Sequence, residues 1–457
     1  RLSLVGSEMC IRDSCTSMER LLITLILVCT MSNITNAQNP FYGQYHTPHG
    51  TVPFDRIETE HYEPAILEGI KLQNAEIEAI IQNPEKADFS NTIEAFEESG
   101  ELLDKVVAVF GNMLSAETND DLQELAQKIM PLLSEHSNNI TLNEKLFARV
   151  KEVYNQKETL QLTQEQKQLL ENAYNSFVRH GANLEGEARE EYRRLTNELS
   201  KLTLTFSENN LKETNAYQML LTKKESLAGL PEIIIEAAAE TAKSEEKEGW
   251  AFTLHAPSYI PFMTYSDNRD LRQKLYMAYN TKCTHDNEFN NIDIVKNIAN
   301  TRMKIAQLLG YKDYAEYTLK KRMAENSESV YKLLNQLLEA YAPTAQQEYK
   351  EIQELAREEQ GDDFVVMPWD WSYYSNKLKD KKFNINEEML RPYFELEQVK
   401  RGVFGLAEKL YGITFRKNTE IPVYHKEVEA FEVFDKDGKF LAVLYTCLLY
   451  TSPSPRD

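Results

Sequence analysis

The sequence predicts a mostly α-helical protein with a minor β component, a hairpin near its C-terminal end. Three observations support this fold class: apolar residues recur at helical spacing from Glu63 onward, capping signals precede several of these stretches, and two β-rich runs flank a turn at 435–438. With 457 residues, of which 42% are hydrophobic, the chain can bury a substantial core and form more than one subdomain.

Capping signals give the helix starts. Asn91 followed by Glu94 has the form of an N-cap with a returning side chain, and Thr163 followed by Gln166 repeats it. Apolar residues alternate spacings of three and four over 192–206, which predicts a long packed helix. A coiled-coil seam is the alternative for this stripe, but its short length and helical surroundings favour packing in a core.

A mixed segment interrupts the helices. The sequence Leu227–Pro231 breaks the helical pattern, and Trp250–Leu254 alternates as a strand does. Helical spacing returns after Asp267, and a further helix is expected to stop at Gly310. No tandem repeat or low-complexity linker is visible, so the sequence gives only two broad regions, 38–250 and 251–446.

The hairpin near the C-terminal end has a clear signal. The β-rich runs Val428–Phe434 and Phe440–Tyr445 lie on either side of Asp435–Gly438. A lone hairpin is marginally stable in water, and further strands are expected beyond Thr446. We therefore expect weak protection from hydrogen exchange over 424–446 and strong protection in the helix at 192–206.

Both ends of the sequence are interpreted as translated adapter DNA, 1–14 and 447–457. If Met9–Ser14 is written as the codons ATG TGT ATA AGA GAC AG, the complementary strand, shifted by one base, reads Cys-Leu-Leu-Tyr-Thr, the order found at 447–451. One DNA element read on opposite strands accounts for both ends, and it resembles a transposase sequencing adapter. Such residues are excluded from fold reasoning.

A signal peptide is predicted at 18–37. After Met18, Arg20 supplies a minimal positive region, which is followed by the apolar run Leu21–Met31 and a small-residue end at Ala37. The run is too short to span a bilayer comfortably, so no stable membrane insertion is expected after its removal. We expect an exported, periplasmic protein; lipoprotein anchoring through Cys29 is the less favoured alternative, because a bulky valine precedes it.

Charge and cysteine content narrow the classes of partner and chemistry. The formal net charge of −21 argues against nucleic acid, because phosphates need a basic face. Cys283 is the one cysteine outside the signal and the presumed leader and adapter residues, so no disulfide framework is expected. It is expected to be a passenger thiol, since only His285 lies near it in the sequence.

No catalytic, cofactor-binding or metal-ligating residue can be assigned from the motifs. A helical zinc peptidase needs two histidines one turn apart with a glutamate between them, and this H-E-x-x-H pattern is absent from the sequence. His46 and His49 are close in sequence, but the proline and glycine around them indicate a surface turn. The G-x-S-x-G elbow and phosphate-binding glycine loops are also missing.

The aromatic cluster Pro368–Ser375 is the most distinctive local feature. We interpret it as a helix start, with Asp370 near the positive end and the rings in the core. The alternative is that the rings line a peptide groove.

At this cluster the chain resembles the thimet oligopeptidase family of zinc metallopeptidases. The resemblance covers about Asn39 to Thr446 and is closest to the bacterial dipeptidyl carboxypeptidase and oligopeptidase A branch. It rests on the order of its motifs, which are Pro53-Phe54, His61-Tyr62, Leu254–Pro261, Pro368-Trp369-Asp370 with Tyr373-Tyr374, Leu390–Phe394, Gly402-Val403-Phe404, Leu410–Ile413 and Tyr424–Val428. Tyrosine stands at 424, where the family commonly has tryptophan.

The resemblance implies a two-lobed helical peptidase with a deep channel, in which one zinc ion and a glutamate-activated water cleave short peptides. It implies that 251–446 begins an incomplete catalytic lobe and that the ligands and catalytic glutamate follow the hairpin. No position is carried over, and His425 is not assigned to metal. We expect this chain to bind no zinc and to be inactive by itself. The alternatives are a non-catalytic helical periplasmic binding protein or a relative without an active site.

Overall fold

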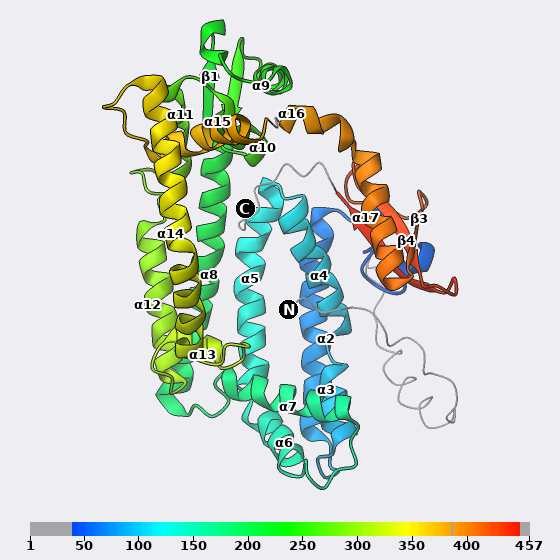
Figure 1. Ribbon diagram of the computed structural model, residues 1–457. Helices are drawn as coiled ribbons and strands as arrows, with labels where there is room; N and C mark the ends of the chain where they lie inside the picture. The colour runs from blue at the N-terminus through cyan, green and yellow to red at the C-terminus, as the bar shows by residue number, and fades with distance from the viewer. Residues whose placement is uncertain (1–38, 385–386, 448–457) are drawn as a thin grey trace. The chain divides into compact units, whose positions relative to one another are not determined.

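Helices dominate the computed structural model, which describes residues 39–384 and 387–447 (Figure 1). The α-helices are α2 Tyr62–Gln82, α3 Ala95–Glu97, α4 Glu101–Ala116, α5 Asp120–Thr141, α6 Glu144–Asn155, α7 Gln164–Arg179, α8 Gly186–Ala216, α9 Glu232–Ser244, α10 Ala256–Tyr265, α11 Arg269–Asn280, α12 Ile292–Leu308, α13 Tyr314–Leu319, α14 Ser327–Gln360, α15 Trp371–Phe383, α16 Glu387–Leu390 and α17 Leu396–Tyr411. The strands are β1 Gln218–Leu221, β2 Trp250–Thr253, β3 Thr414–Lys417, β4 Glu429–Phe434 and β5 Phe440–Thr446. The predicted fold class is confirmed.

The chain divides into two units, and the first is discontinuous in sequence. Unit 1 takes its described residues from the chain up to Gln73, from Gly100–Thr118 and from Arg391 onward. Unit 2 contains Asn74–Ser99 and Asn119–Leu390. Each unit is described separately below.

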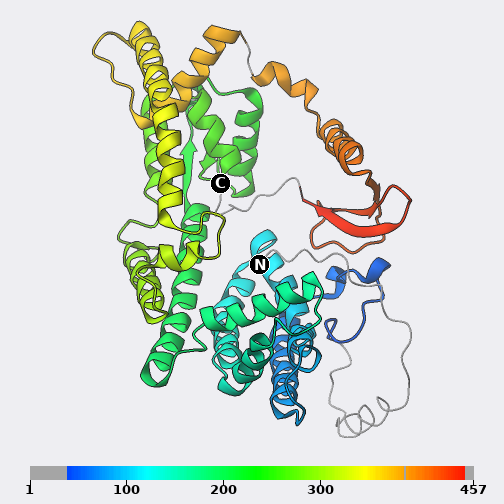
Figure 2. The same ribbon diagram turned by 60° about the horizontal axis from the view of Figure 1, so that its bottom comes forward.

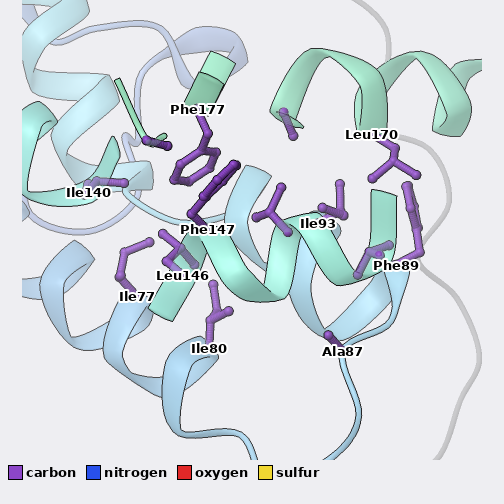
Figure 3. Close-up of a cluster of buried hydrophobic side chains, with 14 residues drawn as sticks. Ile77, Ile80, Ala87, Phe89, Ile93, Ile140, Leu146, Phe147, Leu170 and Phe177 are labelled. Carbon is purple, nitrogen blue, oxygen red and sulfur yellow. The ribbon is translucent and has the colours of Figure 1, made fainter. Parts of the chain in front are cut away.

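A cluster of aromatic and aliphatic side chains forms one core of unit 2. The ring of Phe147 on α6 stacks on Phe177 of α7, with a centroid distance of 5.8 Å (Figure 3). It also stacks on Tyr174, with a centroid distance of 5.9 Å. Leu146 and Ile93 are fully buried in the same cluster. The apolar spacing that predicted these helices therefore places one face of each in a shared core.

Of the two predicted helix N-caps, one is confirmed and the other lies at a different residue. Thr163 accepts a hydrogen bond from the backbone of Gln166, whose side chain returns to the backbone of Thr163, as predicted for α7. At the other site the N-cap is Asp88, three residues before the expected Asn91, and Asn91 supplies the returning side chain. The expectation was wrong because the amide of Asn91 serves the returning role that had been given to Glu94.

Helix α8 includes the predicted helix over 192–206, and it packs against α5 and α12. The α5–α8 contact is polar for much of its length: Asn138 donates to Thr196 at 2.9 Å, and Ser134 donates to Asn197 at 2.8 Å. These bonds fix the register of the two helices, since a shift by one turn would leave buried polar groups unpaired.

The strand predicted at Trp250–Leu254 is present as β2, and it pairs with β1, which was not predicted, in a two-stranded antiparallel sheet with Met219 opposite Phe252. Gly229 lies in the loop before α9 at φ +86°, a conformation that favours glycine. An added Cβ there would meet the carbonyl oxygen of Tyr265 and lie 2.8 Å from Cγ of Asp267. The positive φ and this close approach together explain why glycine occupies position 229.

Unit 1 contains a three-stranded antiparallel sheet with the order β3-β4-β5. The predicted hairpin is present, with Glu429 opposite Thr446 and the turn over 435–439. The expectation that this hairpin has no further strand within the chain was wrong. Strand β3 pairs with β4, with Thr414 opposite Phe434. Figure 2 shows the N-terminal segment in blue beside the red strands of this sheet.

Several sequence predictions fall outside the part of the chain that the structure describes. These are the predicted signal peptide at 18–37 and the residues interpreted as adapter at 1–14 and 447–457, of which the structure describes only Cys447. Within the described helices, none is long and apolar enough to cross a membrane.

Candidate functional site

The start of α15 is organised around a buried carboxylate. Asp370 has no exposed surface, and it accepts hydrogen bonds from Arg272 Nη2 at 2.8 Å, from Arg269 Nη2 at 2.8 Å and from the backbone N–H of Met367 at 3.0 Å. Arg272 is itself only 2% exposed. Because both charges are removed from water, each is stable only with the other in place. Asp370 thus ties the start of α15 to α11, about a hundred residues earlier.

An aromatic ring packs against each of the two arginines that bind Asp370. The guanidinium of Arg272 lies 4.1 Å from the ring centroid of Tyr373, and that of Arg269 lies 4.3 Å from the ring of Phe364. The hydroxyl of Tyr373 donates to Asp267 Oδ1 at 2.7 Å. Each guanidinium nitrogen of Arg272 also donates a hydrogen bond, to Trp369 O, Ser266 O or Asp370, so we interpret the cluster as a structural joint between α11 and α15.

The aromatic cluster is divided between core and surface. Tyr373 and Tyr374 are buried, as the core interpretation expects. Trp371 is 41% exposed and stacks on Tyr349 of α14, with ring centroids 6.3 Å apart. The indole Nε1 of Trp369 is buried without a hydrogen-bond partner.

The histidines occupy unrelated places. His136 is buried in α5 and His255 precedes α10; burial lowers the pKa of both, and the charge of Lys282 adds to the lowering at His255. His425 Nδ1 accepts from the backbone of Glu427. Among residues 39–384 and 387–447, no group of three or more His, Cys, Asp or Glu side chains could hold a metal ion.

Cys283 and its neighbours do not form a nucleophile site. Burial and the adjacent Glu213 raise the pKa of the thiol to about 12. A thiol with such a pKa is almost wholly protonated near neutral pH, and the thiolate is the reactive form. The structure therefore gives Cys283 the inert character expected from the sequence.

His49 links the N-terminal segment to the sheet of unit 1. Its Nε2 lies 2.6 Å from Oε1 of Glu432, and its ring stacks on Phe440 with centroids 3.8 Å apart. Arg416 of β3 donates from Nε to the other oxygen of Glu432 at 2.8 Å. The surface turn predicted at His46–His49 is present, but His49 has a structural partner that lies 383 residues away in sequence.

The pKa of Glu432 falls to about 2, because His49 and Arg416 hydrogen-bond to its ionised form. Its unfolded pKa is near 4.5, so on acidification the unfolded chain binds this proton first. The stabilisation is therefore complete above about pH 4.5 and is lost as the pH falls toward 2.

We expect Glu432→Gln to remove this pH dependence from the sheet. Pulsed hydrogen exchange of the peptides over 429–446, at matched pH values between 5 and 2.5, should show protection falling with pH in the wild type and a smaller change in the variant. Comparison at each pH cancels the intrinsic exchange rate. Glu420→Gln is the control, since the side chain of this exposed glutamate makes no hydrogen bond or ion pair with any residue that the structure describes. Equal pH profiles for wild type and Glu432→Gln would refute the assignment.

A cavity of about 450 Å³ lies between the start of α17 and the sheet of unit 1. Its wall includes Lys400, Lys417 and Glu429, and both lysines pair with this one carboxylate. The two lysines lower the pKa of Glu429, so it stays ionised. Because these charges are paired with one another, the cavity wall does not form a ligand set for a metal.

Comparison with known proteins shows which protein family the chain resembles. Residues 262–449 match the model described as Peptidase family M3. The dipeptidyl carboxypeptidase of Escherichia coli (strain K12) is 36% identical over 409 residues, which is 89% of this chain and 60% of that protein. Oligopeptidase A of Salmonella typhimurium (strain LT2) is 31% identical over 411 residues, with the same 89% and 60% coverage. The chain is thus similar to peptidases of family M3.

The chain spans about 60% of the length of these curated relatives. The matched model includes α11, α14, α15 and α17 together with the sheet of unit 1, and so it includes the Asp370 cluster. The match to the M3 family model therefore confirms the resemblance that the motifs around Pro368–Asp370 indicated.

The two arginines of the Asp370 cluster were not anticipated. Arg269 and Arg272 lie three residues apart at the start of α11, directly after the N-cap Asn268. Their i, i+3 spacing puts both guanidinium groups on one helix face, and this was the available signal. The sequence did not reveal that the acceptor would be Asp370.

Proposed function

We propose that this chain is part of an exported zinc-dependent peptidase that hydrolyses short peptides, as a peptidyl-dipeptidase or an oligopeptidase. The observation that carries this is its similarity to proteins named dipeptidyl carboxypeptidase and oligopeptidase A, over 89% of the chain. The acidic surface suits a protein that handles peptides more than one that handles nucleic acid.

Zinc does not fit the residues of this chain. The sequence lacks H-E-x-x-H, and the described residues hold no cluster of ligands for a metal. We therefore propose that the ligands and the general base belong to polypeptide that follows this part in the complete protein. By itself the chain would be inactive.

Helix α17 supports this proposal. One face packs on the sheet, where Phe404 stacks on Phe415 with centroids 4.2 Å apart. A second stripe on this helix carries apolar residues spaced three and four apart, all exposed: Leu396, Val399, Val403, Leu406 and Leu410. A surface of this kind in a monomer marks a site that another element covers.

The direct test compares residues 39–446 with the product of the complete gene. The shorter chain should contain no stoichiometric zinc and should leave short peptides intact, whereas the longer protein should bind one zinc ion and hydrolyse them. One tightly held zinc per short chain would refute the proposal. A complete gene without H-E-x-x-H would favour a non-catalytic binding protein.

Export is proposed from residues 18–37 alone. A reporter fused after Gln38 should appear outside the inner membrane, and Leu25→Arg should retain it inside the cell, because the charge interrupts the apolar run. Equal export without residues 18–37 would refute this localisation.

A further inference from the structure

Helix α14 carries one continuous apolar stripe along its 34 residues. Successive members are three or four positions apart, so they lie on one face of the helix. The stripe consists of Tyr331, Leu334, Leu338, Tyr341, Ala345, Tyr349, Ile352 and Ala356. The opposite face is polar, with Lys332, Gln336, Glu339 and Gln346. The pattern is that of a helix with one side against protein and the other in water.

The structure covers only one end of this stripe. Ile352 and Ala356 are 3% and 0% exposed, because they pack in a core with Tyr374 of α15. At the other end Tyr331, Leu338 and Tyr341 are 64%, 64% and 66% exposed. Both ends have the same chemistry and spacing. A helix packs on the covered end, so the exposed end has the shape to take another helix.

We infer that the exposed half of this stripe is the docking surface for an apolar helical segment of the same polypeptide, beyond the part described. This rests on the proposed function, in which the chain continues. The covered end is packed by α15, which follows α14 in sequence, and the similar peptidases are longer than the match by about two fifths of their length. The exposed half of the stripe bears two tyrosines, Tyr331 and Tyr341, and no charge, so it selects an apolar partner face.

A second copy of the chain could cover the same stripe, but the observations favour the continuation. The exposed stripe of α17 shows the same spacing in the other unit, and both helices lie within the match to M3 peptidases. The test separates the two occupants.

The accessibility of the two faces of α14 can be measured by the labelling rate of single introduced cysteines. Leu338→Cys places a thiol on the stripe, and Gln336→Cys places a matched control on the polar face of the same turn. Maleimide labelling, read by mass spectrometry at each position, should proceed at similar rates in residues 39–446. In the product of the complete gene, position 338 should react at least about tenfold more slowly than position 336, because labelling then requires local opening.

Equal labelling at both positions in the longer protein would overturn the inference. Protection at 338 in the shorter chain that rises with protein concentration would overturn it in favour of a second copy. Should Leu338→Cys fail to fold, hydrogen exchange of the wild-type peptides over 327–342 replaces it, with faster exchange expected in the shorter chain. Zinc content is measured on the same samples: a longer protein that protects position 338 but holds no zinc keeps this inference and refutes the proposed function.

Discussion

Replacing Asp370 by asparagine should destabilise unit 2 by about 3–5 kcal/mol. The side chain keeps its shape but loses its charge, and Arg272 is then left buried without a counter-ion. Urea unfolding followed by tryptophan fluorescence isolates this effect, because Trp250, Trp369 and Trp371 all belong to unit 2 and are the only three tryptophans in the sequence.

The matched control for this measurement is Asp362→Asn, which alters an exposed aspartate in the loop before α15. It should change the free energy of unfolding by less than about 0.5 kcal/mol. A similar small change for Asp370→Asn would show that solvent reaches the cluster, and that Asp370 does not hold α15 to α11.

Gly229→Ala should also be strongly destabilising, for a reason in the backbone. At φ +86° a residue with a Cβ costs about 1–2 kcal/mol, and the contact with the carbonyl of Tyr265 adds about 1–3 kcal/mol. We expect a total of about 2–5 kcal/mol in the same tryptophan-monitored unfolding of unit 2.

Gly310→Ala separates the two contributions. Gly310 has nearly the same backbone angle, φ +84°, but an added Cβ there has no atom within 4 Å. This variant should lose only the conformational part, about 1–2 kcal/mol. Equal losses for both variants would mean that the loop at Gly229 relaxes without strain around the added methyl group.

Features set by neighbours in sequence could be predicted, and features set by distant partners could not. The capping box of Thr163 and Gln166 involves residues that are three positions apart in sequence. The turn of the β4–β5 hairpin is likewise local, because it is formed by Asp435 to Gly438. The Asp370 cluster depends on arginines that are 98 and 101 residues away in sequence. The sequence therefore drew attention to Asp370 but did not indicate that these arginines are its partners. Its position before a helix suggested a cap, and the tertiary contact gave it a further role.

Strand β3 was missed for a different reason. It has only four residues, Thr414–Lys417, and two of them are basic, so neither length nor alternation distinguishes it from a loop. Its strand conformation comes from pairing with β4, which is itself strongly patterned. The link of His49 to Glu432 was equally inaccessible, because nothing near His49 in the sequence indicates a partner at the far end of the chain.

The discontinuity of unit 1 has a consequence for the order of events on the ribosome. Its first stretch and its sheet meet through residues 383 positions apart, such as His49 and Glu432. At an elongation rate of roughly 5–20 residues per second, the N-terminal stretch waits about 20–75 s for its partner to be synthesised. Unit 2 lies almost wholly within that interval, so its helices can fold first. During the wait, the face of Phe54 that later meets Tyr424 and Tyr445 is open to chaperones.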